Sequence, residues 1–149
     1  MGRDVNRRTL LLLICLALSL AFAGWQWLRP YDSASDPAAR FHMVHASVTR
    51  DHSNLWLDLY LKHLGGAPHD LTKPVTLQLA DGRQIEPATT TLEGDGATTG
   101  LGFRFWLEDA DFAGPLELGI NDGTLSVRSE SGVPIGRDET SRHFTHRNW

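Results

Sequence analysis

Cysteine is nearly absent from this chain of 149 residues. A single Cys15 can form neither a disulfide framework nor a zinc site built on several thiolates. The chain also lacks the G-x-x-x-x-G-K-[ST] phosphate loop, the G-x-G-x-x-G fingerprint and the G-x-S-x-G nucleophile turn. No nucleophile, base and orienting group can be assembled from the sequence, so we expect a protein that is not an enzyme and that needs no cofactor.

Charged residues are unevenly distributed along the chain. Residues 1–40 hold five of the 14 basic and three of the 18 acidic residues, which leaves 9 basic and 15 acidic residues in residues 41–149. The net charge of this larger part is therefore −6, against −4 for the whole chain. A mildly acidic surface argues against nucleic acid as a partner.

The longest apolar run is Thr9–Leu28, which contains no charged residue. As a helix it would span about 30 Å, the thickness of the hydrocarbon core of a bilayer. Arg3, Arg7 and Arg8 precede it and are offset only by Asp4. This basic excess predicts a cytoplasmic N-terminus (residues 1–8), a transmembrane helix (9–28) and export of the remainder across a bacterial inner membrane.

A cleaved signal peptide is the alternative interpretation of the same segment. Residues 21–23 (AFA) before Gly24 fit an A-x-A cleavage site. The apolar character continues beyond that site through Trp25 and Trp27, which together with Tyr31 suit an interfacial aromatic belt. The sequence therefore favours an uncleaved signal anchor, followed by a short polar linker over residues 29–40.

Beyond the linker, apolar and polar residues alternate with a period of two. The segments with this pattern are separated by turn signals such as Asp81-Gly82 and Asn121-Asp122-Gly123. They predict about seven short strands, at residues 41–49, 54–64, 75–80, 83–85, 101–107, 116–120 and 124–128, with a weaker one at 89–92. We therefore expect an all-β exported domain over residues 41–128, an immunoglobulin-like antiparallel β-sandwich that follows the single N-terminal helix.

The alternation also assigns side chains to faces. The expected inward set is Leu55, Leu57, Leu59, Val75, Leu77, Leu79, Phe103, Phe105, Leu116, Leu118 and Val127. Trp56 and Trp106 fall on the opposite register from their neighbours, so we expect them outside the core. There they are exposed, packed under a loop or, as we propose for these two, in contact with a partner.

The C-terminal segment, residues 129–149, lacks strand alternation. Basic and aromatic residues are interleaved there, with Arg142 and Arg147 beside Phe144 and Trp149. We expect this tail to dock onto a larger protein, with a frayed terminus as the alternative.

Histidines form the one cluster with metal-ligand chemistry. His42 and His45 make one H-x-x-H pair with Met43 between them, and His143 and His146 make another. Imidazole and thioether groups suit copper, but we expect ordinary surface or hydrogen-bonding histidines here and no metal site, with copper as the alternative. Residues three apart on a regular strand point to opposite faces, so His42 and His45 could chelate together only at a turn or a bulge.

This layout resembles bitopic bacterial membrane proteins with immunoglobulin-like periplasmic domains, a likeness of architecture over residues 9–128 without a diagnostic motif. It implies a non-catalytic accessory subunit of a larger inner-membrane complex, such as a respiratory or photosynthetic assembly. Its expected partners are the membrane and other membrane subunits. The alternative function is periplasmic binding or delivery of copper through the histidine clusters.

Overall fold

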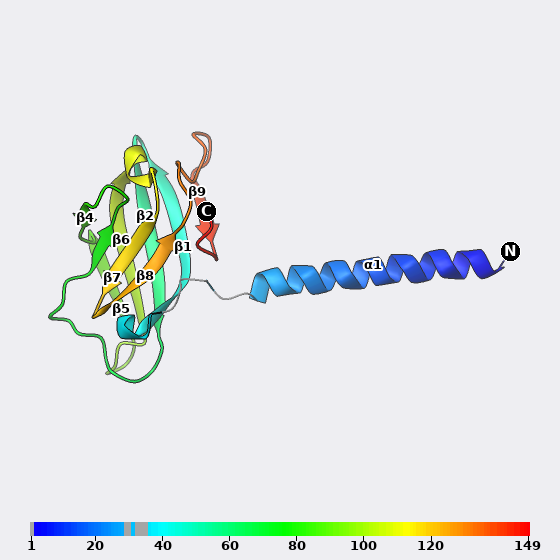
Figure 1. The fold of residues 1–149 in the computed structure, drawn as a ribbon, viewed down its shortest axis with the longest axis horizontal. Helices are drawn as coiled ribbons and strands as arrows, with labels where there is room; N and C mark the ends of the chain where they lie inside the picture. Colours follow the sequence, from blue (N-terminus) through cyan, green and yellow to red (C-terminus); the bar gives the residue numbers. More distant parts are fainter. Residues whose placement is uncertain (1, 29–30, 32–35) are drawn as a thin grey trace.

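The computed structural model describes residues 2–28, 31 and 36–149, and in these residues one long helix precedes a β-sandwich-like domain (Figure 1). Positions 29–30 and 32–35 of the expected linker lie outside the described residues. The domain is built from two antiparallel sheets.

Helix α1 (Gly2–Leu28) includes the whole apolar run. Its segment Asn6–Leu28 is long and apolar enough to cross a membrane, and none of that span is buried against the domain. Leucine and alanine favour helix, and a surface that is apolar on all sides suits a lipid environment. A signal sequence near the N-terminus has the same length and composition.

Nine strands form the domain. The five-stranded sheet has the order β5-β6-β2-β1-β9, and the four-stranded sheet has the order β4-β3-β7-β8. Their bounds in chain order are β1 (Phe41–Asp51), β2 (Asn54–His63), β3 (Thr76–Gln78), β4 (Gln84–Ile85), β5 (Thr89–Glu93), β6 (Gly100–Glu108), β7 (Leu116–Ile120), β8 (Gly123–Arg128) and β9 (Ser141–Phe144). The expectation of about seven strands was too low, because β9 was not recognised within the tail.

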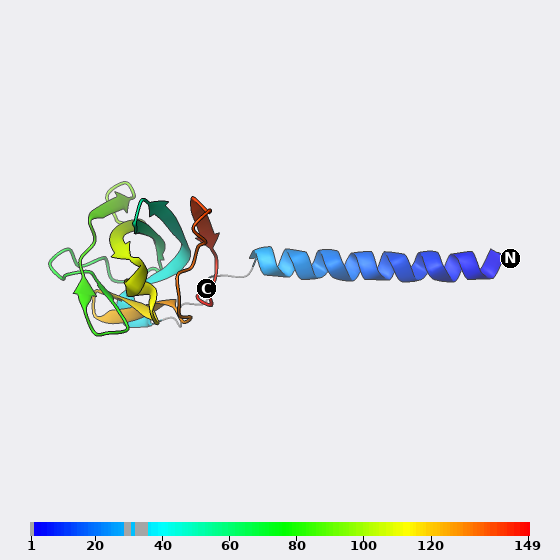
Figure 2. The ribbon, with the colours of Figure 1, turned by 90° about the horizontal axis from the view of Figure 1, so that it is seen from above.

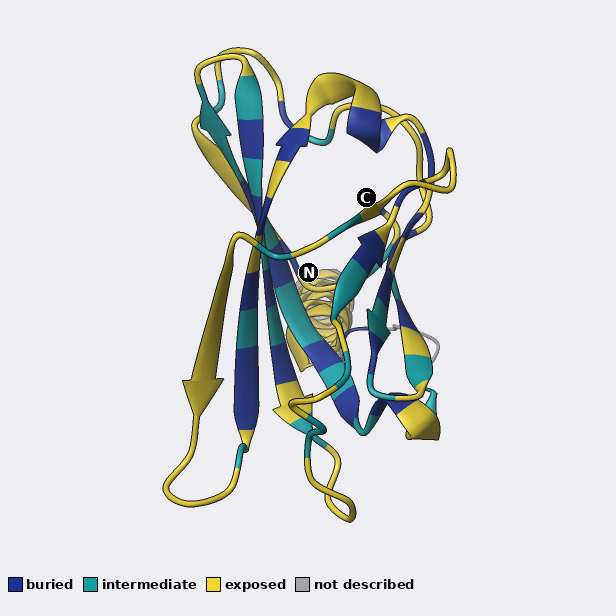
Figure 3. Ribbon diagram, turned by 90° about the vertical axis from the view of Figure 1, so that its left-hand side faces the viewer, coloured by how far each residue is buried: buried dark blue, intermediate teal, exposed yellow. Residues whose placement is uncertain are grey.

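The core lies between the two sheets. Figure 2 shows these sheets from above. Leu55, Leu57 and Leu59 on β2 pair in register with Leu107, Phe105 and Phe103 on β6. All these side chains are buried, and buried residues alternate with more exposed ones along both strands (Figure 3). The expected inward set is confirmed throughout, with Val75 only partly buried at the margin of the core.

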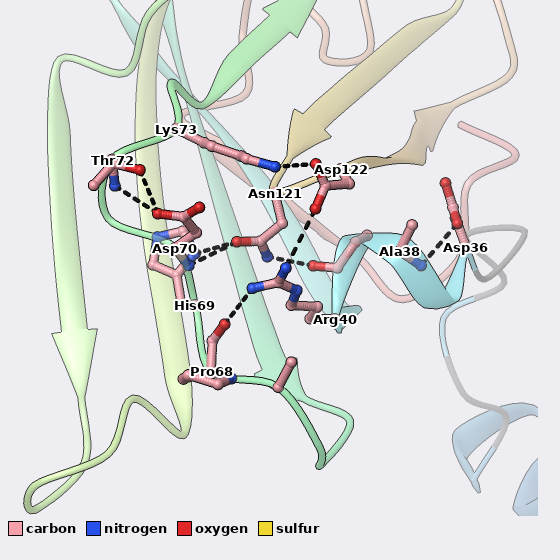
Figure 4. A network of polar contacts seen from close by, with 12 residues as sticks. Asp36, Ala38, Arg40, Pro68, His69, Asp70, Thr72, Lys73, Asn121 and Asp122 are labelled. Carbon is pink, nitrogen blue, oxygen red and sulfur yellow. Dashed lines mark hydrogen bonds and ion pairs between the residues drawn. The ribbon is translucent and has the colours of Figure 1, made fainter.

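A polar network closes one end of the domain (Figure 4). Asn121, in the turn between β7 and β8, has a left-handed backbone with φ of 53°. Its side-chain amide donates to the carbonyl oxygen of Ala39, 2.6 Å away, and its Oδ1 accepts from the backbone N–H of Asp70 at 2.9 Å. Arg40 donates to the carbonyl of Pro68 at 2.6 Å. These bonds hold the short helix η1 (Pro37–Ala39) and the connection after β2 against the β7–β8 turn.

At the C-terminal end of β8, the guanidinium of Arg128 is buried. It donates to the backbone oxygens of Trp149, Phe112 and Gly132. Its Cζ lies 5.5 Å from the ring centre of Phe112 and 5.1 Å from that of Trp149. Burial lowers the pKa of Arg128, partly opposed by the charge of Glu130. One side chain thus joins β8, the short helix η2 (Asp109–Phe112) and the end of the tail.

Residues 141–144 of the tail are therefore part of the domain, and this part of the tail is not a frayed terminus. Strand β9 pairs with β1 from Ala46↔Phe144 to Thr49↔Ser141. The rings of Phe144 and Trp149 stack 4.1 Å apart, and both side chains are buried. The sequence showed no alternation here because only four residues are paired and Phe144 is the one that is buried.

Tyr31 connects the segment before β1 to the same region. Its hydroxyl donates to the carbonyl of Val127 and accepts from the indole N–H of Trp149, 3.0 Å away. Burial raises the pKa of Tyr31 to about 12, although the hydrogen bond from Trp149 and the charge of Arg147 act in the opposite direction. Tyr31 was expected in an interfacial belt, and it packs instead in the domain core.

Replacing Arg128 with methionine is expected to lower the free energy of unfolding by about 3 kcal/mol, because three backbone oxygens lose this donor. The measurement is urea unfolding of the full chain in a non-ionic detergent, followed by tryptophan fluorescence. Arg142→Met is the matched control, because the half-exposed Arg142 pairs with Glu139 at the surface. A control effect below about 1 kcal/mol is expected. Equal effects of the two substitutions would contradict the role given to Arg128.

Alkaline pH is expected to destabilise the domain through Tyr31. An unfolded tyrosine loses its proton near pH 10, whereas the folded Tyr31 keeps it to about 12. The contribution of Tyr31 to the free energy of unfolding is therefore fully present below pH 10. It is lost as the pH rises from 10 to 12, by up to about 3 kcal/mol. Urea unfolding at a series of pH values measures the slope. Tyr31→Phe should flatten the slope in this window, and an unchanged slope would contradict the assignment.

Candidate functional site

The candidate site is the solvent side of the five-stranded sheet, here called the outer face. It is defined by the side chains of His45, Trp56, Asp58, Tyr60, Glu93, Arg104, Trp106 and His143. Alternation places these residues opposite the buried leucines and phenylalanines of the same strands. The strands that build the core therefore also build this surface.

An aromatic cluster occupies one end of the outer face. Trp56 and Trp106 are direct cross-strand partners, with ring centres 4.3 Å apart in an edge-to-face arrangement. The Cζ of Arg104 lies 5.4 Å from the ring centre of Trp56, whose indole N–H donates to Asp51 at 3.1 Å. Trp106 is 39% exposed. The prediction that both tryptophans leave the core is confirmed, and their meeting on adjacent strands is the new finding.

A hollow of about 390 Å³ lies beside this cluster. Gly102 sits between Tyr60 and Thr91 on the neighbouring strands and supplies no side chain to fill the space. Asp58 on its wall accepts two hydrogen bonds from Arg104, at 2.6 and 2.9 Å. The lining residues are His45, Asp58, Leu59, Tyr60, Thr89, Thr91, Glu93, Gly102, Phe103 and Arg104.

Tyr60 and Glu93 close the far side of the hollow. The hydroxyl of Tyr60 donates to Glu93 Oε2 at 2.6 Å, across strand β6. Gly100 makes this contact possible, because a Cβ there would stand 2.8 Å from Glu93 Oε2 and 3.0 Å from the Tyr60 oxygen. Hydrogen bonding to Glu93 raises the pKa of Tyr60, with smaller contributions from burial and from the negative charge.

A β-bulge in β1 orients the histidines of the first H-x-x-H pair. The register shifts between Met43 and His45, so that His42 opposes Lys62 while His45 opposes Tyr60. Lys62 and Tyr60 share one face of β2, and directly opposed residues point to the same side. His42 and His45 therefore share the outer side of the sheet. The sequence predicted that His42 and His45 could share one side of the strand only at a turn or a bulge, and β1 contains such a bulge.

Met43 does not belong to this group, because it opposes Leu61 and is fully buried in the core. The structure thus separates the expected thioether from the imidazoles. His143 on β9 lies near His45, with ring centres 6.3 Å apart, whereas His146 follows the strand and is exposed. Within residues 2–28, 31 and 36–149, no group of three or more His, Cys, Asp or Glu side chains could hold a metal ion.

The residues expected to contact partners divide into three groups. Trp25 and Trp27 are exposed at the end of α1, and Trp56 and Trp106 lie on the outer face. Phe144 and Trp149 are buried against each other, which removes them from the accessible surface. Arg142 is half exposed and pairs with Glu139, and Arg147 is half-buried and accepts from the backbone N–H of Ser129 through its carbonyl.

Asp58, Tyr60, Glu93 and Arg104 were not expected as site residues. The sequence pattern could have placed three of them on the same face as the tryptophans. Asp58 and Tyr60 follow Trp56 at two-residue intervals, and Arg104 precedes Trp106 by two residues. Glu93 gave no signal, since its contact with Tyr60 depends on the pairing of β5 with β6. Comparisons with protein-family models, with curated proteins and with solved structures found no match to this chain.

A spectrophotometric titration tests the Tyr60–Glu93 contact, because the chain contains only two tyrosines. We expect both phenol groups to ionise above pH 10, Tyr31 because of burial and Tyr60 because of Glu93. Glu93→Gln should shift one of the two ionisations to lower pH, and Tyr60→Phe should remove that same ionisation. Glu117→Gln, on the exposed face of β7, is the control and should change neither.

Proposed function

We propose that this protein is a non-catalytic, membrane-anchored accessory subunit of a larger inner-membrane complex, such as a respiratory or photosynthetic assembly. In this proposal α1 is an uncleaved anchor with a cytoplasmic N-terminus, and the β-domain is an immunoglobulin-like periplasmic module. The basic residues before the apolar run and the fully exposed surface of the span Asn6–Leu28 support this orientation and role. A single helix with this surface can pack against other membrane helices.

The observation that carries the proposal is the combination of side chains on the outer face. Tryptophan, tyrosine and arginine are enriched at the energetically dominant positions of protein interfaces. Trp56 contacts both Trp106 and Arg104 on the adjacent strands β2 and β6, beside a hollow that can receive a partner side chain. Side chains that their neighbours already hold in place lose little conformational entropy on association.

The polar groups of the outer face support binding rather than chemistry. Asp58 is bound to Arg104, and Glu93 is bound to Tyr60, so each carboxylate of the hollow already has a partner. A general base or a nucleophile needs a group placed to exchange a proton with a substrate. Paired charges instead give a surface of defined shape and charge, which favours specificity in association.

Site-specific photo-cross-linking in cells tests the proposal. A photoreactive residue at position 106 is compared with one at position 117, which lies on the exposed face of the other sheet. We expect position 106 to cross-link to one membrane protein that also co-purifies with the full chain in fixed stoichiometry, and position 117 to give no such product. A chain that purifies alone as a monomer and yields no cross-link from position 106 would overturn the proposal.

Trp106→Ala should weaken the same association, because it removes the exposed ring from the cluster. The expected loss is about 2 kcal/mol, or roughly thirtyfold in affinity, as for a tryptophan at the centre of an interface. Leu71→Ala, which truncates another strongly exposed apolar side chain, is the matched control and should leave the association unchanged.

A further inference from the structure

Two histidines that are far apart in the chain meet at the β1–β9 edge of the outer face. His45 reaches this face through the bulge after Met43, and His143, the penultimate residue of β9, pairs with Ser47. Their ring centres are 6.3 Å apart at an interplanar angle of 64°. Because Ser47 lies two residues beyond His45, the two imidazoles are diagonal neighbours on one side of the sheet.

This separation is close to that of two imidazoles that share a metal ion. With nitrogen–metal distances of about 2.0–2.1 Å, ring centres lie about 4.5 Å apart for adjacent coordination positions and about 6.4 Å apart for opposite ones. His143 is exposed on the edge strand β9, so its ring can reorient by rotation of the side chain alone. Such a rotation does not require the pairing of β1 with β9 to change.

The orientation of the His45 ring is restricted by its neighbour on β2. His45 stacks on Tyr60, with ring centres 5.3 Å apart. The neutral imidazole ring is the form that coordinates a metal ion.

We propose that His45 and His143 together bind one divalent late transition-metal ion, with Cu²⁺ bound most tightly and solvent completing its coordination. Two imidazole nitrogens and two oxygens are a ligand set that Cu²⁺ accepts in a planar arrangement, and Cu²⁺ exceeds Ni²⁺ and Zn²⁺ in affinity for such ligands. The bound ion connects β9 to β1 and so stabilises the attachment of the tail to the domain. This site uses neither Met43 nor His146.

Copper titration of the full chain, purified without a histidine tag in a non-ionic detergent, tests this site. We expect one equivalent of Cu²⁺ to bind, an electron paramagnetic resonance spectrum with coupling to two imidazole nitrogens, and a rise in the thermal midpoint. His45→Ala and His143→Ala should each weaken binding by at least about tenfold. Each substitution should also reduce the nitrogen coupling in the spectrum from two imidazole nitrogens to one.

His52→Ala is the matched control, because His52 is 94% exposed in the β1–β2 turn and lies outside the pair. It removes one imidazole from the chain and should leave affinity and spectrum unchanged. Equal copper binding by the wild type and by the His45→Ala/His143→Ala double variant would overturn the proposal, as would an absence of binding at 100-fold excess copper over protein. Neither result bears on the cross-linking test of the tryptophan cluster.

Discussion

The pairing of β2 with β6 is the constraint on which the rest of the domain depends. These two strands lie side by side in the five-stranded sheet and are in register from Asn54↔Glu108 to Lys62↔Gly100. Each inward pair, such as Leu57 and Phe105, sets the position of an outward pair, such as Trp56 and Trp106. A shift of one residue would exchange the two faces, so burial of the core also determines the composition of the outer face.

At the margins of the sheets, side chains donate hydrogen bonds to backbone oxygens that have no partner strand. Arg128 donates to three backbone oxygens from separate parts of the chain, and the hydroxyl of Tyr31 donates to the carbonyl of Val127. Buried carbonyls without donors are costly, and one guanidinium can serve several of them. The end of the tail and the segment before β1 are thereby held on the same margin of the domain.

Much of the fold followed from local patterns, and particular residues show where these patterns failed. The alternation around Leu57 and Phe105 was strong enough to predict both the strands and the core. Strand β9 was missed because SRHF is short and polar and owes its conformation to β1. The burial of Arg128 and Trp149 could not be anticipated, because each depends on the other and they are 21 residues apart.

The sequence by itself determined the apolar helix and the face on which each central-strand side chain lies, because hydrophobicity and period-two alternation are properties of neighbouring residues. The tertiary structure alone decided which side chains meet. Tyr60 reaches Glu93, and His45 approaches His143, only because of the order of the strands and a bulge in β1. Strand order and register result from packing the whole core, so contacts between distant segments cannot be read from any one of them.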